Sequence, residues 1–229
     1  MSDYYTLMTA LPWLPDLEQC TQLPISRIAL DRRLTMLSEH DSEQLSKIEA
    51  VFNPIIDQHI SLTDKDFITQ WKATVQQVES PRMLALINDQ MELKTLLAAL
   101  RCRAGGLEDP SQFYGAGRWV QLIKKHWFEP GFGLDRVCPQ LLQLQRLMAK
   151  EKPMLVEDYY NQQLWTRLRQ AEHCVQFSFE ALACFVLRWS IAERCLRYDG
   201  DKAVDMFNRS RSALLDRSGL NQQLLQGNR

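Results

Sequence analysis

The sequence predicts an all-α, multi-helix protein, and three observations carry that prediction. Apolar residues recur at the three- and four-residue spacing of one helix face along most of the 229-residue chain. Capping residues, first-turn prolines and a glycine pair mark helix starts and stops. No segment alternates apolar and polar residues convincingly, and no Asn-Gly or Asp-Gly hairpin signal lies between such segments.

The elements of the N-terminal part follow in chain order. The segment YYTLMTALPWL is compatible with either a short strand or a helix. Asp41 is expected to cap a helix whose apolar residues keep helical spacing as far as Ile56. Thr63 and Asp66 then form a capping-box pattern, which predicts a helix carrying Phe67, Trp71, Val75 and Val78.

The central helix has a marked start and a marked end. Ser80 is an N-cap residue followed by a first-turn proline, and Gly105-Gly106 is a C-terminal stop signal. Asp109-Pro110 repeats the cap-and-proline arrangement. Further helices are expected at 111–128, 135–150, 156–173 and 201–216.

The segment FEALACFVLRWSIAERC, residues 179–195, is the most apolar helix of the chain. On a helical wheel its apolar residues form two nearly opposite arcs, and a helix with two apolar faces is sandwiched between neighbours. Glu193 and Arg197 form an i,i+4 pair in the favourable order. Arg188 has no partner within its own helix, so its guanidinium must reach solvent or a carboxylate on another helix or on a partner protein.

Composition argues for a soluble, reduced, cytoplasmic protein. Apolar residues make up 45% and charged residues 24%, and no apolar run reaches the roughly 18 residues that a membrane span needs. The N-terminus has no basic leader, and the six cysteines show no C-x-x-C spacing. The net charge of −1 provides no general attraction for nucleic acid, so GRWVQLIKKHWF, at 117–128, is interpreted as an ordinary amphipathic helix.

No pattern points to catalysis or to a cofactor. The acidic EHDSE segment lies at a helix start, where carboxylates are favoured by the helix dipole. His40 and His59 lie near helix ends, and His173-Cys174 are neighbours that point about 100° apart on a helix, so they do not form a chelating pair. The glycines of GAGRW and GFGLD do not follow strands, so they are interpreted as loop or kink residues rather than phosphate-binding loops.

Four sequence blocks follow one another along the chain. The first two are Tyr4-Tyr5-Thr6-Leu7 through Leu11-Pro12, and Ile25-Ser26 leading to Leu30 and Leu34. The third is Glu92-Leu93 through Leu100 and Arg103 to Gly105. The fourth is Phe177 to Arg194, followed by Asp199-Gly200 and Phe207. Together the blocks cover nearly the whole chain, and in this order they resemble a small family of short bacterial proteins labelled V-type ATP synthase subunits.

The family is similar in turn to the C (or d) subunit of archaeal and vacuolar-type rotary ATPases, an all-helical funnel of repeated bundles that seats the central stalk on the membrane ring. Its repeats contain a helix ending in L-R-x-K-x-x-G, which LLAALRCRAGG resembles with Arg103 in place of the lysine. The short chain leaves little room for the third repeat of the longer relatives. The resemblance implies one domain over 1–229, with two weakly similar helical repeats at about 25–128 and 129–216.

The resemblance implies a non-catalytic structural subunit that couples the rotor stalk to the proteolipid ring of an ion pump. Its expected partners are central-stalk and ring subunits, with no nucleic acid and no span of its own, and it would be cytoplasmic and peripheral to the membrane. No metal or cofactor is expected. The candidate partner-facing residues are Arg101, Arg103, Arg188 and Arg194, for which pairing within the chain is an equal alternative. The alternative function is a free-standing cytosolic helical adaptor or regulator.

Overall fold

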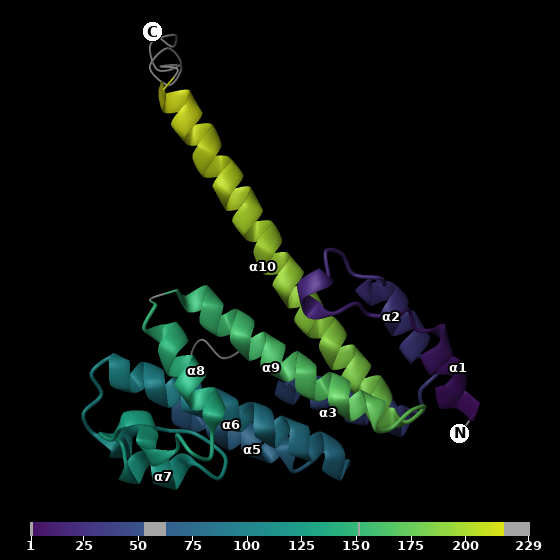
Figure 1. Cartoon of the computed structure of the whole chain (residues 1–229). Coiled ribbons are helices and arrows are strands. Elements are labelled where there is room, and N and C mark those ends of the chain that lie inside the picture. The colour runs from purple at the N-terminus through teal and green to yellow at the C-terminus, as the bar shows by residue number, and fades with distance from the viewer. Residues whose placement is uncertain (1, 53–62, 151, 218–229) are drawn as a thin grey trace. The chain divides into compact units, whose positions relative to one another are not determined.

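The computed structural model describes residues 2–52, 63–150 and 152–217, with side chains described between Tyr4 and Tyr198. Within these ranges the chain is helical and contains no strand, so the all-α prediction is confirmed (Figure 1). The chain divides into two compact units: the first is Met1–Pro12 with Ile25–Arg188, and the second is Trp13–Pro24 with Trp189–Arg229. The single domain and the two repeats stay predictions.

The described residues at the start of the first unit form α1, α2, α3 and α5. The segment that was compatible with a strand or a helix forms α1 (Ser2–Ala10), which contacts α2 (Arg27–Leu34). Next come α3 (Glu39–Phe52) and α5 (Asp64–Val75), which pack against each other. Buried apolar residues line the inner faces of α1, α2 and α3: Leu7, Leu30, Leu45, Ile48, Val51 and Phe52.

Helix starts in this region follow side-chain capping. The backbone N–H of Asp66 donates to Thr63 Oγ1, as the capping box predicted. The expectation that Asp41 caps α3 is wrong: the cap lies three residues earlier, where Ser38 Oγ accepts from the backbone N–H of Asp41 at 3.1 Å. Asp41 instead occupies the first helical turn, where the helix dipole stabilises its negative charge. His59 and the predicted end of this helix, at Ile56, lie outside the described residues.

The helix α6 (Pro81–Ala104) is central to the first unit. It starts with Ser80 as N-cap and Pro81 in its first turn, and it ends at Gly105, as expected. It contacts α3, α8 (Pro139–Met148) and α9 (Pro153–His173), and α8 and α9 also pack on each other. Its buried residues include Met83, Ile87, Met91, Leu93, Leu96, Leu97 and Leu100.

The predicted continuous helix at 111–128 is wrong. Its place is taken by the short 3-10 helix η2 (Pro110–Gln112), an irregular stretch, and then α7 (Val120–Lys125), with η3 (Pro130–Gly133) beyond it. Gly117 adopts a φ of +102°, and a Cβ at this position would lie 2.4 Å from Glu92 Cγ of α6. Glycine disfavours helix, and here it allows the backbone to approach α6 closely. The interpretation as loop or kink residues is confirmed: Gly115 and Gly117 lie outside helices, and Gly131 lies at a kink within η3.

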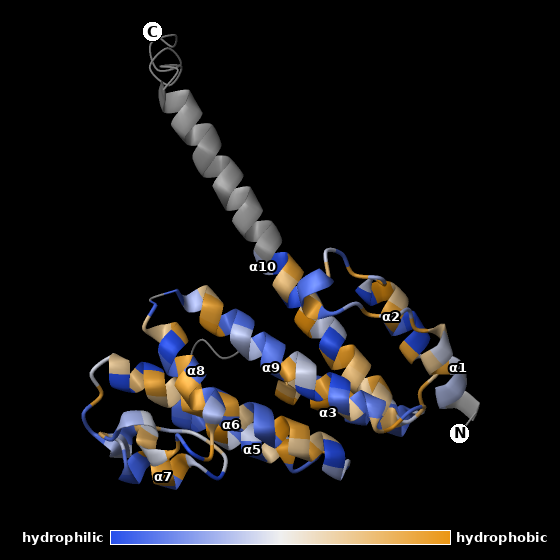
Figure 2. Ribbon diagram, in the orientation of Figure 1, coloured by the Kyte–Doolittle hydropathy of each residue, from blue (hydrophilic) through white to orange (hydrophobic). Residues whose placement is uncertain are grey.

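The apolar helix α10 (Phe179–Arg217) is longer than expected, because the helix predicted separately at 201–216 is its continuation. The backbone passes through Gly200 without a break. One interior glycine costs only about 1 kcal/mol relative to alanine, which a long helix can absorb. Residues up to Arg188 belong to the first unit and the rest to the second. Figure 2 shows apolar residues on successive turns of its N-terminal part.

The sandwiched position predicted for this helix is confirmed in the first unit. Seven consecutive side chains from Ala181 to Leu187 are buried, so no side of these two turns faces solvent. In the second unit, which also holds η1 (Leu17–Gln19), Arg197 pairs with Glu193 at 3.3 Å, as the i,i+4 spacing predicted. No helix within the described ranges combines the length and the apolar character of a membrane span.

All six cysteines are free thiols, and their surroundings differ. Cys20, Cys138 and Cys184 are buried, whereas Cys174, the residue that ends α9, is exposed. Burial raises the pKa of the Cys184 thiol to about 12.

Candidate functional site

The candidate partner-facing arginines lie in three different settings. Arg101 and Arg103 are both in the last turn of α6. Arg101 is exposed at the surface, and Arg103 is half-buried. Arg188 is buried in α10, with only 6% of its surface exposed, and Arg194 is an exposed residue of the second unit. Of the four, Arg101 and Arg194 are therefore the exposed ones.

Arg103 connects α6 to the segment 107–138, which we call the aromatic lobe. Its Nη1 donates to the carbonyl oxygen of Glu129 at 2.8 Å and to that of Trp127 at 3.2 Å. Its guanidinium carbon lies 4.3 Å from the centroid of the Phe132 ring. Five N–H donors in a planar group suit arginine to such combined carbonyl and aromatic contacts. Arg103 thus holds this lobe on the end of α6.

The aromatic lobe has its own small core and a mixed surface. The Trp127 ring lies between Phe113 and Phe132, with centroid distances of 5.4 and 5.6 Å, and its Nε1 donates to the carbonyl oxygen of Leu107. Figure 2 shows hydrophobic and hydrophilic residues interleaved over α7 and the surrounding loops. The exposed residues include Tyr114, Arg118, Leu122, Lys125 and Phe128. This surface has the residue types of a protein-binding face, with apolar groups beside cations.

Polar contacts also hold the irregular stretch of this lobe against α6. Thr95 is buried, and its Oγ1 donates to the carbonyl oxygen of Ala116 while accepting from the Ala116 backbone N–H. Glu92 accepts from the backbone N–H of Arg118 at 3.2 Å and pairs with its guanidinium at 3.1 Å. One hydroxyl therefore satisfies both backbone groups of a buried loop residue.

We expect Thr95→Val to lower the free energy of unfolding by about 1–3 kcal/mol. Valine preserves the shape of the side chain but leaves both buried backbone groups of Ala116 without their partner. The matched control is Thr166→Val, because the exposed Thr166 hydroxyl makes only an i−4 bond to Gln162. Urea denaturation of the two variants measures the difference, and equal stabilities would contradict a bridging role for Thr95.

Arg188 is paired within the chain. Its Nη2 donates to Glu172 Oε2 in the last turn of α9, and its guanidinium carbon lies 5.1 Å from the centroid of the Trp165 ring. The internal alternative considered for this arginine is therefore the one observed. Arg188 Nε and Trp165 Nε1 are buried without a hydrogen-bond partner among the described residues.

Glu172 is a carboxylate in an unfavourable position. Burial raises its pKa above the ordinary value of 4.5, and the opposing attraction of Arg188 does not cancel that effect. Its place at the C-terminal end of α9 adds to the cost, because a helix dipole disfavours a negative charge there. The charged state of Glu172 thus depends on Arg188.

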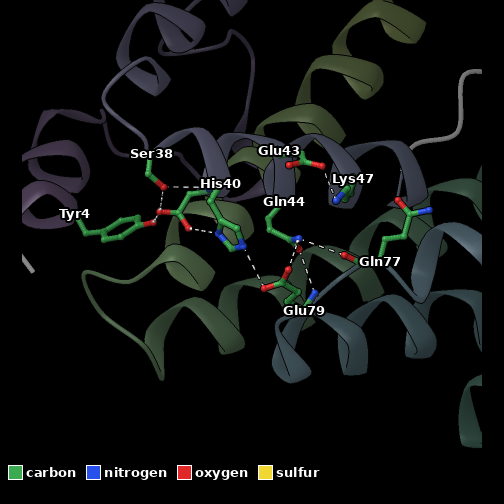
Figure 3. Close-up of polar contacts among 9 residues, drawn as sticks. Tyr4, Ser38, His40, Glu43, Gln44, Lys47, Gln77 and Glu79 are labelled. Atoms are coloured by element: carbon green, nitrogen blue, oxygen red, sulfur yellow. Dashed lines mark hydrogen bonds and ion pairs between the residues drawn. The ribbon is translucent and has the colours of Figure 1, made fainter.

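A second polar site, which we call the histidine cluster, joins α1, α3 and the connection before α6 (Figure 3). Tyr4 donates its hydroxyl to Asp41 Oδ2 at 2.6 Å, and Ser38 donates to the same oxygen at 2.8 Å. His40 lies between two carboxylates: Nδ1 is 3.6 Å from Asp41 Oδ1, and Nε2 is 3.2 Å from Glu79 Oε2.

The same cluster is completed by Gln44, one turn further along α3. Its Nε2 donates to Glu79 Oε1 and to the carbonyl oxygen of Gln77, each at 3.3 Å. Its Oε1 accepts from the Glu79 backbone N–H at 3.1 Å. Gln44 is buried, whereas His40 and Glu79 are exposed at the surface. The amide therefore links the chain at 77–79 to α3, next to the contact that His40 makes with Glu79.

The electrostatics of the histidine cluster favour ions over neutral groups. Hydrogen bonding to Glu79, and then to Asp41, raises the pKa of His40 above 6.5. Burial opposes ionisation of Asp41, but hydrogen bonds from Tyr4, Ser38 and His40 outweigh it and lower the Asp41 pKa. A free ring nitrogen is needed for a general base, and here both nitrogens face carboxylates. This histidine is consequently suited to an ionic link.

Sequence reasoning missed this cluster. It placed His40 near a helix end, but its partners come from residues 4 and 79, which one-dimensional spacing does not connect. The Ser-x-x-Asp pattern at 38–41 was the available local signal, because it marks a helix start whose acid can accept further donors.

In the parts of the chain that the structure describes, no group of three His, Cys, Asp or Glu side chains is arranged to hold a metal ion. Comparisons with protein-family models, curated proteins and solved structures find no match to this chain.

Proposed function

We propose that this chain is a non-catalytic structural subunit of a V-type rotary ATPase that couples the central rotor stalk to the membrane ring. The observation that carries the proposal is the ordered series of sequence blocks from Tyr4 to Phe207 that resembles the short bacterial V-type subunit family. In this role the chain is cytoplasmic and is held at the membrane by its partner subunits.

The positions of these blocks support the proposal. Tyr4-Tyr5 lies on α1, Ser26 is the N-cap of α2, and the Glu92–Gly105 block ends α6. The most apolar block begins α10. A torque-transmitting subunit requires a helical framework with partner contacts at its surface rather than a catalytic pocket. The exposed cation at the end of α6, Arg101, beside the aromatic lobe that Arg103 holds, is the face that we assign to a partner subunit.

Affinity purification of the tagged chain from its native host is expected to recover stalk and ring subunits of a rotary ATPase. Arg101→Glu should reduce that recovery severalfold, because charge reversal at an interface repels a complementary partner. Arg146→Glu is the matched control, since Arg146 is an exposed arginine in the last turn of another helix, α8. Recovery of unrelated cytosolic proteins in place of ATPase subunits would contradict the proposal and favour the adaptor alternative.

A further inference from the structure

His40 lies where two carboxylates from different elements meet. Asp41 comes from α3 itself, and Glu79 comes from the connection between α5 and α6, so the imidazole spans 39 positions of the chain. The other groups around it are Glu43, which pairs with Lys47 on α3, and the Tyr4 hydroxyl of α1, which binds Asp41. Figure 3 shows the His40 ring with Glu79 on one side and Tyr4 and Ser38 on the other.

The protonation state of the ring decides how many of these contacts are favourable. Imidazolium has two N–H donors, one for each carboxylate, whereas neutral imidazole has only one. In the neutral ring the other nitrogen presents a lone pair to an anion, so one of the two contacts becomes repulsive. A charged ring can therefore hold Asp41 and Glu79 together, and a neutral ring cannot.

We propose that His40 is a pH-dependent crosslink between the start of α3 and the segment preceding α6, closed when the imidazole is charged and open when it is neutral. The link involves only residues of the first unit and does not rest on the proposed function. The direction follows from the geometry: protonation tightens the attachment of the 77–79 segment, and deprotonation loosens it. Since the pKa of His40 is raised in the folded chain, the stability that the crosslink contributes is complete below pH 6.5. It is lost as the pH rises through the folded pKa of His40.

An NMR titration of the histidine rings tests the proposal directly in the full chain, with His40 assigned by the loss of its signal in His40→Gln. We expect His40 to titrate above 6.5 and Glu79→Gln to lower its pKa, because the amide carries no charge. Glu108→Gln, at an exposed glutamate of the aromatic lobe, is the matched control and should leave the titration unchanged. A His40 pKa at or below 6.5, or one that Glu79→Gln does not move, overturns the crosslink.

The Glu79 backbone N–H donates to Gln44 Oε1, so its hydrogen exchange reports how firmly the 77–79 segment is attached to α3. After correction for intrinsic rates, its protection should fall about two- to fivefold between pH 6 and pH 8.5, the range expected for loss of a surface ion pair. His40→Arg, a permanent cation, should keep the higher protection at both pH values, and His40→Gln should show the lower protection at both. Protection that is independent of pH in the wild-type chain shows that the histidine does not control the segment.

Discussion

Arg188→Leu is expected to lower the free energy of unfolding by about 3–5 kcal/mol. The substitution leaves the Glu172 carboxylate without the guanidinium that donates to it, and it removes the same guanidinium from the face of the Trp165 ring. Breaking a buried ion pair by deleting one member costs this much because the remaining charge loses its compensation, and the 20% exposure of the Glu172 side chain places the expected loss at the lower end of the range. Urea or guanidinium denaturation, monitored by circular dichroism, gives the value.

The loss should depend on pH in a specified direction. Glu172 already has a raised pKa, and without Arg188 the largest opposing attraction disappears, so the pKa rises further. Because the folded pKa of Glu172 lies above 4.5, its carboxyl costs the folded state nothing below pH 4.5, where it is protonated. Ionisation then lowers the free energy of unfolding as the pH rises through the folded pKa. Arg188→Leu should therefore be less damaging at pH 5 than at pH 8.

A double substitution separates the ion pair from simple loss of packing. Arg188→Leu with Glu172→Leu removes both charges, and replacing a buried pair by apolar residues is often neutral or stabilising. The double variant should regain most of the stability that the single variant loses. The exposed Arg146→Leu is the matched control, with an expected change within about 0.5 kcal/mol. If the Arg188 and Arg146 variants were equally stable, the Arg188 side chain would contribute nothing to the core.

Trp127→Ala is expected to lower the free energy of unfolding by about 3–5 kcal/mol, the range for a buried tryptophan truncated to alanine. The indole is 1% exposed and contacts the Phe113 and Phe132 rings. Its loss also frees the Leu107 carbonyl oxygen that Nε1 satisfies. Because these contacts all lie within the aromatic lobe, limited proteolysis should cut first between residues 107 and 138.

The neighbouring aromatic residue provides the control for this experiment. Phe128 follows Trp127 directly but is 76% exposed, so Phe128→Ala should change stability by less than about 0.5 kcal/mol. The same variant tests the partner surface proposed for the lobe: that proposal predicts weaker co-purification of Phe128→Ala with an unaltered fold. Similar destabilisation by both alanine variants would show that the lobe has no tryptophan-centred core.

Local sequence signals were sufficient to predict those helix ends that are set by contacts within a single turn. Ser80 with Pro81, Thr63 with Asp66, and Gly105 define helix ends through contacts within one turn, and the structure has each of these ends. The buried faces of α6 and α10 follow from helical periodicity alone, since a side chain repeats its direction about every 3.6 residues.

Other features depend on contacts between distant segments and could not be predicted from the sequence. The helix expected at 111–128 does not form where the backbone groups of Ala116 and Arg118 make hydrogen bonds to the side chains of Thr95 and Glu92 instead of to one another along a helix. The wheel of α10 showed that Arg188 needed a partner, but the choice of Glu172 depends on how α9 packs. The histidine cluster likewise exists only after α1, α3 and the 77–79 segment have come together.

Because the cysteines differ in burial, a thiol-directed reagent should react with some of them much faster than with others. Alkylating reagents attack the thiolate, so the Cys184 thiol, with a pKa of about 12, is almost unreactive at neutral pH. Cys174 is exposed and lies two residues beyond Glu172. A maleimide dye would therefore attach at Cys174 in preference to the buried thiols, and the label would lie close in sequence to the Glu172–Arg188 ion pair.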